Sequence, residues 1–358
     1  MSVLSDICVA TTPPTLRQRQ FTLVGVVVLF IAVAAVGPFA AMQWLRVTSF
    51  VPAVAVMNFA ANLVTAALLF TQFSITSQRS LLVLANGYLF SALIVIPWCL
   101  TFPGVIAPLT FPTAGLQSTP WLYIFWTFGF SAAVVGYAYL KKKETEGATE
   151  RSTRPALRWS VFVVISLVCG LTWGVTAGNQ LIPSLFLNEI EFSPLAHPIS
   201  AICLFTCTIA LTLLWARCTS VLDLWLMVAI SALLLELIMV TMIITGRFSV
   251  GFYASGALSV IVSTSVLVAL LTETKRLYRT LQRDRKGRRT DLETVVAKIA
   301  QEVRQPLTGI VTMGAAAKQF LEQSPPDVES IKDMLDQMIS ASFQANEAFK
   351  NSWIVRAG

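Results

Sequence analysis

Charge is scarce in this chain of 358 residues, of which only 13% are charged and 55% are hydrophobic. Soluble globular domains carry about 25% charged residues, so the composition excludes an ordinary soluble protein. The net charge is +7, but the basic residues lie beside apolar runs, where membrane orientation explains them. We therefore predict an integral protein of the lipid bilayer and expect no nucleic-acid partner.

Histidine is almost absent, because His197 is the only one. The six cysteines form no Cys-x-x-Cys pair, and most lie in or beside apolar runs, as small buried residues do. No phosphate-binding loop, zinc-ligand spacing or Ser/His/Asp set is present. The sequence therefore predicts neither a metal site nor a bound cofactor.

Apolar runs of membrane length are abundant, since about 20 residues suffice for one transmembrane helix. Isolated runs of this length cross a bilayer as helices. Spans are predicted near residues 21–42, 53–73, 80–100, 121–140, 157–177, 197–216, 221–245 and 252–272. The expected fold is all-α, with an eight-helix integral membrane domain over 21–272 after an N-terminal segment 1–20 that holds no signal peptide.

The basic residues of the short loops predict the orientation of these spans. With eight spans, most Lys and Arg fall on one side, including those between 141 and 158. The uncharged stretch 101–120 and the acidic stretch 178–196 fall on the other side, and only Arg46 and Arg247 depart from this rule. Because Lys and Arg favour the cytoplasmic side, we expect both termini in the cytoplasm and His197 on the opposite face.

Three polar side chains inside the spans are candidate sensing residues. Glu236 lies in the span 221–245, and an ionisable group at such a depth is costly and is a functional hypothesis by default. The alternative is that Glu236 is protonated or bonded to a neighbouring helix and fixes packing. Asn58 and Asn62 are four residues apart and share one helix face. For these two we expect hydrogen bonds between helices.

The stretch 101–120 is apolar and rich in proline, so it could fold back on the membrane surface and line a pocket. Trp98, Trp121 and Trp126 flank it. Tryptophan is enriched at membrane–water interfaces, and we expect these three residues to form an interfacial belt.

From residue 273 the chain becomes charged. Residues 273–291 predict a basic helical linker that anionic lipid head groups would attract, or a solvated helix face. Apolar residues then recur at alternating steps of four and three, which is a heptad pattern: Leu292, Val296, Ile299, Val303, Pro306, Ile310 and Met313. Ser-Pro-Pro-Asp at 324–327 ends this helix, and a second stripe runs from Val328 to Phe349. One hairpin (292–352, with the tail 353–358) cannot bury both stripes, so we predict a homodimer with a cytoplasmic four-helix bundle.

The stretch IAQEVRQPLTGI (299–310), with this turn and the second amphipathic helix, resembles the dimerisation and histidine-phosphotransfer (HisKA) hairpin of sensor histidine kinases. Gln301 stands where the resemblance implies the phosphoacceptor His. The other positions of the box are Glu302, Arg304, Gln305, Pro306 and Leu307. An imidazole nitrogen attacks the γ-phosphoryl group in such kinases, whereas an amide nitrogen is not a nucleophile.

The membrane part, over roughly residues 15–275, resembles the fourth class of bacterial membrane-associated sensor domains (the MASE group). The matching stretches are GYLFSALIVIP, LTFPG, WLYIFWTFGF and GRFSVGFYASG. The resemblance implies a multi-pass protein of the bacterial inner (plasma) membrane that precedes a kinase or diguanylate cyclase module. It also implies His residues at the positions of Trp98 and Thr127, so this chain departs from the pattern there.

Together these features predict a membrane-bound sensor of two-component signal transduction that has no catalytic residue and does not autophosphorylate. The hairpin lacks the acceptor His, and no ATP-binding domain follows it in the chain. Besides forming a homodimer, it could pair with a complete histidine kinase or dock a response regulator. Two alternatives stay open. One is a response-regulator phosphatase in which Glu302 and Gln305 position water, and the other is the remnant of a truncated or frameshifted kinase gene.

Overall fold

The computed structural model describes residues 14–103, 115, 117–145, 153–178, 182–185, 193–243, 248–321, 329, 332–333 and 336–344, although not every side chain from residue 273 onward. The chain divides into two compact units, Met1–Lys275 and Arg276–Gly358. Among the described residues, eight helices are long and apolar enough to cross a membrane. The predicted all-α fold with eight spans is therefore confirmed.

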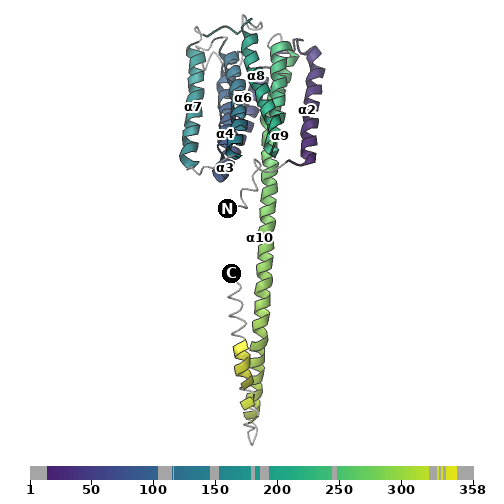
Figure 1. Cartoon of the computed structure of the whole chain (residues 1–358), viewed down its shortest axis with the longest axis vertical. Helices are drawn as coiled ribbons and strands as arrows, with labels where there is room; N and C mark the ends of the chain where they lie inside the picture. The colour runs from purple at the N-terminus through teal and green to yellow at the C-terminus, as the bar shows by residue number, and fades with distance from the viewer. Residues whose placement is uncertain are drawn as a thin grey trace. The chain divides into compact units, whose positions relative to one another are not determined.

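The first unit is a bundle of membrane-length helices (Figure 1). In chain order the elements are α2 (Leu16–Val36), η1 (Gly37–Phe39), α3 (Phe50–Thr76), α4 (Arg79–Leu100), α6 (Ser118–Thr145), α7 (Thr153–Ala177), α8 (Ala196–Ala216), α9 (Val221–Ile238), η2 (Met239–Ile243) and α10 (Val250–Leu321). Helices α4 and α9 are the most buried of the spans, whereas α2 and α7 stand at opposite edges of the bundle. The core therefore lies around α4 and α9, and the apolar outer faces are left for lipid.

Glycines let α4 and α6 approach each other closely. A Cβ added at Gly87 would lie 2.5 Å from the Cβ of Ala133, and one at Gly129 would lie 2.4 Å from Cε1 of Phe90. Small residues at such contacts are the usual means of close packing between membrane helices, because lipid provides no hydrophobic driving force between them.

The first predicted span is displaced in the structure. Helix α2 begins at Leu16 instead of residue 21, because Thr15 caps it: the Gln18 backbone N–H donates to Thr15 Oγ1 (3.3 Å), and the Thr15 N–H donates to Gln18 Oε1 (2.9 Å). This capping box supplies partners for N–H groups at the helix start. The helix ends at Val36 rather than 42, since a 3-10 turn containing Pro38 follows.

A loop between α2 and α3 is fastened to the start of α10. The Trp44 N–H donates to the Phe248 carbonyl (2.9 Å), and the Tyr253 hydroxyl donates to the Leu45 carbonyl (2.6 Å). The guanidinium of Arg46 lies 4.9 Å from the centre of the Phe248 ring. This cation–π contact gives Arg46 a structural role at a position that departed from the charge rule.

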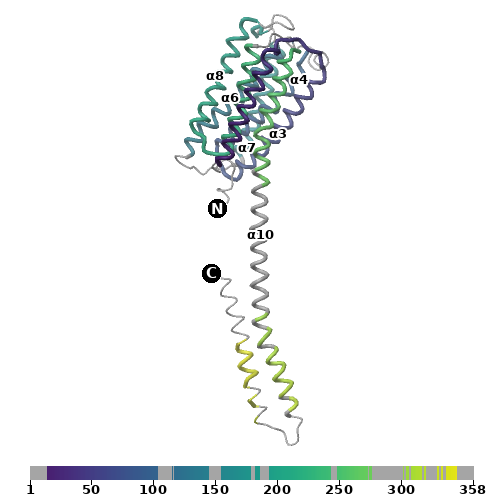
Figure 2. The backbone as a smooth tube through the Cα atoms, turned by 90° about the vertical axis from the view of Figure 1, so that its right-hand side faces the viewer, coloured from purple at the N-terminus to yellow at the C-terminus, as the bar shows by residue number. Residues whose placement is uncertain are grey.

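In the second unit, residues 336–344 form a helix that runs beside the end of α10 in both views (Figures 1 and 2). The Met338 Cε lies 3.3 Å from the place of a Cβ on Gly314, so the two helices of the predicted hairpin meet there. Of the predicted heptad residues, Ile310, Met313 and Met338 are half-buried. The side chains of the other predicted stripe residues before Met313 lie outside the described set, as do those of Glu302, Pro306 and Leu307.

Candidate functional site

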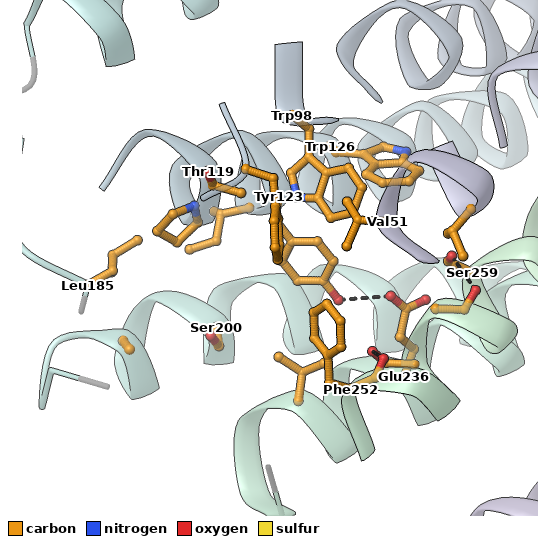
Figure 3. A pocket seen from close by; sticks show the side chains of 18 of the residues that line it. Val51, Trp98, Thr119, Tyr123, Trp126, Leu185, Ser200, Glu236, Phe252 and Ser259 are labelled. Carbon is orange, nitrogen blue, oxygen red and sulfur yellow. Dashed lines mark hydrogen bonds between the residues drawn. The ribbon is translucent and has the colours of Figure 1, made fainter. Parts of the chain in front are cut away.

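A cavity of about 150 Å³ lies within the membrane unit (Figure 3). It is formed by the starts of α3, α6, α8 and α10 and by the ends of α4 and α9. These are the helix ends remote from the Lys-rich terminus of α6. Six of the lining side chains are aromatic: Phe50, Trp98, Phe102, Tyr123, Trp126 and Phe252. Most ligand pockets have this character, with apolar and aromatic walls and few polar groups.

Glu236 is the only acidic or basic side chain among the described residues that line this cavity. It is 4% exposed, and its Oε1 accepts a 3.0 Å hydrogen bond from the Tyr123 hydroxyl (Figure 3). No described residue donates to Oε2. Glu236 therefore bonds to a neighbouring helix, as one interpretation of the sequence expected, and it also lines the cavity.

Trp98 and Trp126, for which the sequence predicts an interfacial belt, have their rings in the wall of the cavity. Both line the cavity, with ring centroids 5.9 Å apart in an edge-to-face arrangement. Trp121 is half-buried, and its Nε1–H donates to the Pro183 carbonyl (3.0 Å). Thr127 is buried and donates to the Tyr123 carbonyl (3.0 Å).

The predicted hydrogen bonds of Asn58 and Asn62 between helices are confirmed, and both join α3 to α10. Asn58 Nδ2 donates to Ser259 Oγ at 3.0 Å, and Asn62 Nδ2 donates to Ser263 Oγ at 3.1 Å. The buried Asn58 Oδ1 has no partner in the described part of the chain. A second cavity of about 20 Å³ lies between Asn62, Ser263 and Glu236, which is room for one water molecule. Asn62 therefore borders the same small cavity as Glu236.

A charged cluster lies near the Lys-rich end of α6. Lys141 Nζ is 2.6 Å from Asp223 Oδ2, and the Tyr137 hydroxyl donates to Asp223 Oδ1 at 2.8 Å. Ser220 caps α9 in a capping box with Asp223. Burial, followed by the negative charge of Asp223, raises the pKa of the Cys218 thiol beside this cluster.

The sequence interpretation missed this cluster and the part that Tyr123 plays. A signal for the first was present, because Ser220 and Asp223 have capping-box spacing directly before an apolar run. For Tyr123 the only signal was a hydroxyl in an apolar span. Among the described residues, no group of three or more His, Cys, Asp or Glu side chains could hold a metal ion. His197 is exposed at the start of α8.

The family model described as a membrane-associated sensor, integral membrane domain (MASE4) matches residues 45–278. The matched segment begins before α3 and contains the residues that line the cavity, whereas α2 precedes it. No curated protein and no solved structure matches the chain. Because the match covers more than half of the sequence, the chain belongs to the MASE4 family of membrane-associated sensors.

Proposed function

We propose that this chain is a membrane-bound sensor of two-component signal transduction, derived from a histidine kinase, that binds its stimulus in the cavity at Tyr123 and Glu236. The cavity is the observation that carries the proposal. It is an aromatic-walled space with one buried carboxyl group, inside a domain of a sensor family. An apolar pocket with a few convergent polar groups is a natural place for a ligand.

The predicted orientation supports a stimulus that arrives from outside the cell or from the outer leaflet. Lys and Arg gather at the opposite helix ends, as in the cluster at the end of α6. Cytoplasmic loops carry this excess of basic residues, so the cavity would open toward the non-cytoplasmic face of the bacterial inner membrane. Both chain termini would then be cytoplasmic.

Helix α10 offers a route for the signal because it lines the cavity and continues to Leu321. Phe252, Ser255, Gly256 and Ser259 are its lining residues, and Ser259 also bonds to Asn58. A ligand that displaces these side chains acts on the same helix that carries the hairpin sequence. Such a ligand shifts an equilibrium only to the extent that it binds one state better than another.

The output would be non-catalytic. Gln301, Arg304 and Gln305 are exposed, so the box presents an accessible surface without an acceptor His. Val311, Ile339 and Phe343 are 71%, 55% and 67% exposed. These apolar side chains support a homodimeric four-helix bundle, or pairing with a complete histidine kinase.

Disulfide crosslinking in membranes tests both parts of the proposal. Ile339→Cys in a cysteine-free background should crosslink between copies, whereas Lys142→Cys in the membrane unit should not. Ser200→Trp fills the cavity from α8 and should change the yield of the Ile339→Cys crosslink. Ala201→Trp, which is exposed on the same helix, is the matched control. Absence of any crosslink, or equal yields for the two Trp variants, would contradict the proposal.

A response-regulator phosphatase is a second candidate. It is favoured by an open groove in the second unit that Gln301, Gln305 and Thr308 line together. Exposed amide and hydroxyl groups so placed could orient water toward a phosphorylated regulator. Decay of a phosphorylated regulator no faster with the purified protein than in buffer would exclude this candidate.

A further inference from the structure

The walls of the cavity contain one carboxyl side chain, Glu236, and no described lining residue supplies a cation that would balance its charge once it is ionised. No described Lys, Arg or His lines the cavity, and the ion pair found in that part joins Lys141 to Asp223 instead. Tyr123 gives Glu236 one hydrogen bond, at Oε1. A carboxylate removed from water is stable only when it is paired, so an ionised Glu236 needs a cation from elsewhere.

Aromatic rings surround the space in front of this carboxyl. Trp98 contacts both Trp126 and Phe102 with ring centroids 5.9 Å apart, and Phe102 lies 6.0 Å from Phe252. Figure 3 shows Trp98, Tyr123 and Phe252 gathered on the side of the cavity that Glu236 faces. Rings arranged in this way attract cations to their faces, and aromatic cages are a recurrent means of binding quaternary ammonium groups.

Other ligand classes fit these walls less well. An anion would meet a carboxylate, and a sugar or other polyol would find few polar partners beyond the hydroxyls of Thr119, Ser200 and Ser255. The size is also restrictive, since an apolar cavity of about 150 Å³ accommodates a molecule such as benzene. The ligand should therefore be compact, mainly hydrocarbon and positively charged.

We infer that the cavity binds a lipophilic cation, an amine or quaternary ammonium group on a hydrocarbon or single-ring body. The ammonium group lies against Glu236 Oε2, and its hydrocarbon part lies against the rings of Trp98 and Phe252. The inference deepens the proposed function and rests on its assignment of this cavity as the sensing site.

Tetramethylammonium and its uncharged isostere neopentane are the probes for the test, because they differ only in nitrogen against carbon and are close to benzene in size. Calorimetric titration of the full chain in lipid nanodiscs measures both affinities, with protein-free nanodiscs as the correction for partitioning. We expect the cation to bind at least about tenfold more tightly than the isostere, the size of a cation–π or charge contribution. Glu236→Gln should abolish this preference, whereas Tyr123→Phe should retain it because the ring and the carboxyl both remain.

A second variant keeps the inference testable if Glu236→Gln does not fold. Trp98→Leu removes one aromatic face and should weaken binding of the cation more than binding of the isostere. Equal binding of both probes by the unaltered chain, or an unchanged preference in Glu236→Gln, overturns the cation inference alone. Binding of neither probe overturns it together with the proposed sensing site. Binding of the cation with no change in the Ile339→Cys crosslink supports the ligand class and contradicts the proposed sensor function.

Discussion

At the scale of single residues, one polar contact both joins two helices and borders a cavity. The Tyr123–Glu236 hydrogen bond joins α6 to α9, yet the same carboxyl faces an aromatic-walled space. Lys141 and Asp223 join the same two helices near their other ends. The two helices are therefore tied at both ends by polar contacts, of which only the first borders the aromatic-walled cavity.

Replacing Lys141 by Met tests the second contact. The Asp223 side chain is 2% exposed and would lose the ammonium partner that compensates for its burial. Removing one member of such a buried pair costs about 3 kcal/mol, and we expect a clearly lower unfolding temperature in detergent. Lys142→Met is the matched control, because Lys142 is exposed on the next position of the helix. Equal unfolding temperatures for the two variants would show that the pair does not stabilise the fold.

Gln301→His tests the proposal that the hairpin cannot accept a phosphoryl group because it lacks the acceptor His. Gln301 is exposed, so the substitution should leave the fold intact while supplying an imidazole nucleophile. When mixed with a complete histidine kinase and labelled ATP, the His variant should gain label and the unaltered chain should not. The control is Gln301→Ala, which should remain unlabelled. Label on the unaltered chain would refute the proposed inactivity.

At the scale of helices, the fold depends on how closely particular pairs approach. Gly256 of α10 faces Phe50 of α3 at the wall of the cavity, and an added Cβ would lie 2.7 Å from Cζ of that ring. Close contact between α3 and α10 is therefore possible only without a side chain at this position. The same two helices are also joined by the Asn–Ser hydrogen bonds, so close packing and hydrogen bonding both hold α3 against α10.

Gly256→Ala should force the Phe50 ring into the cavity or move α10 away from α3. Either movement reduces the space for a ligand, and overpacking of this kind costs about 1–3 kcal/mol. We expect weaker binding of tetramethylammonium and a lower unfolding temperature. Gly174→Ala in α7 is the control, since nothing lies within 4 Å of its added Cβ. The same effect from both substitutions would contradict a specific contact between α3 and α10.

The number of spans was predictable from the sequence, whereas the direction in which their side chains point was not. The lengths of the apolar runs were enough to predict the eight spans. The spacing of Asn58 and Asn62 was enough to predict their hydrogen bonds to another helix. In a membrane, however, residues that face lipid and residues that face the core are equally apolar, so the pattern does not reveal how each helix is rotated. For this reason the sequence does not predict that Trp98 and Trp126 line a cavity. The Lys141–Asp223 contact also required the spatial order of the helices.

At the scale of the whole molecule, the eight spans and the family match establish a multi-pass membrane sensor domain. Its orientation decides which side of the membrane delivers the stimulus. The cavity is lined by helix ends that the charge rule assigns to the non-cytoplasmic face, and the hairpin sequence follows on the last span. Reception and output would then lie on opposite sides of the bilayer.

Single cysteines on a cysteine-free background measure this orientation. His197→Cys at the start of α8 should react with a membrane-impermeant maleimide in intact spheroplasts if the proposed orientation, with the basic loops in the cytoplasm, holds. Lys142→Cys should react only after the membrane is permeabilised. Both positions are exposed, so equal access of reagent is expected once the barrier is removed. The reverse pattern would invert the proposed topology.

The two amide–hydroxyl bonds between α3 and α10 have one more consequence. Asn58 and Asn62 are one helical turn apart, and so are Ser255, Ser259 and Ser263. A slide of α10 by one turn, about 5.4 Å, would pair Asn58 with Ser255 and Asn62 with Ser259 and so preserve both bonds. The same slide would, however, bring Phe252 against Phe50 in place of Gly256, where the close contact leaves no room for a side chain. The two registers are therefore not equivalent, and Gly256 holds α10 in the observed one. Asn62→Cys with Ser263→Cys should form a disulfide and Asn62→Cys with Ser259→Cys should not, and a disulfide in the second pair would show that α10 slides.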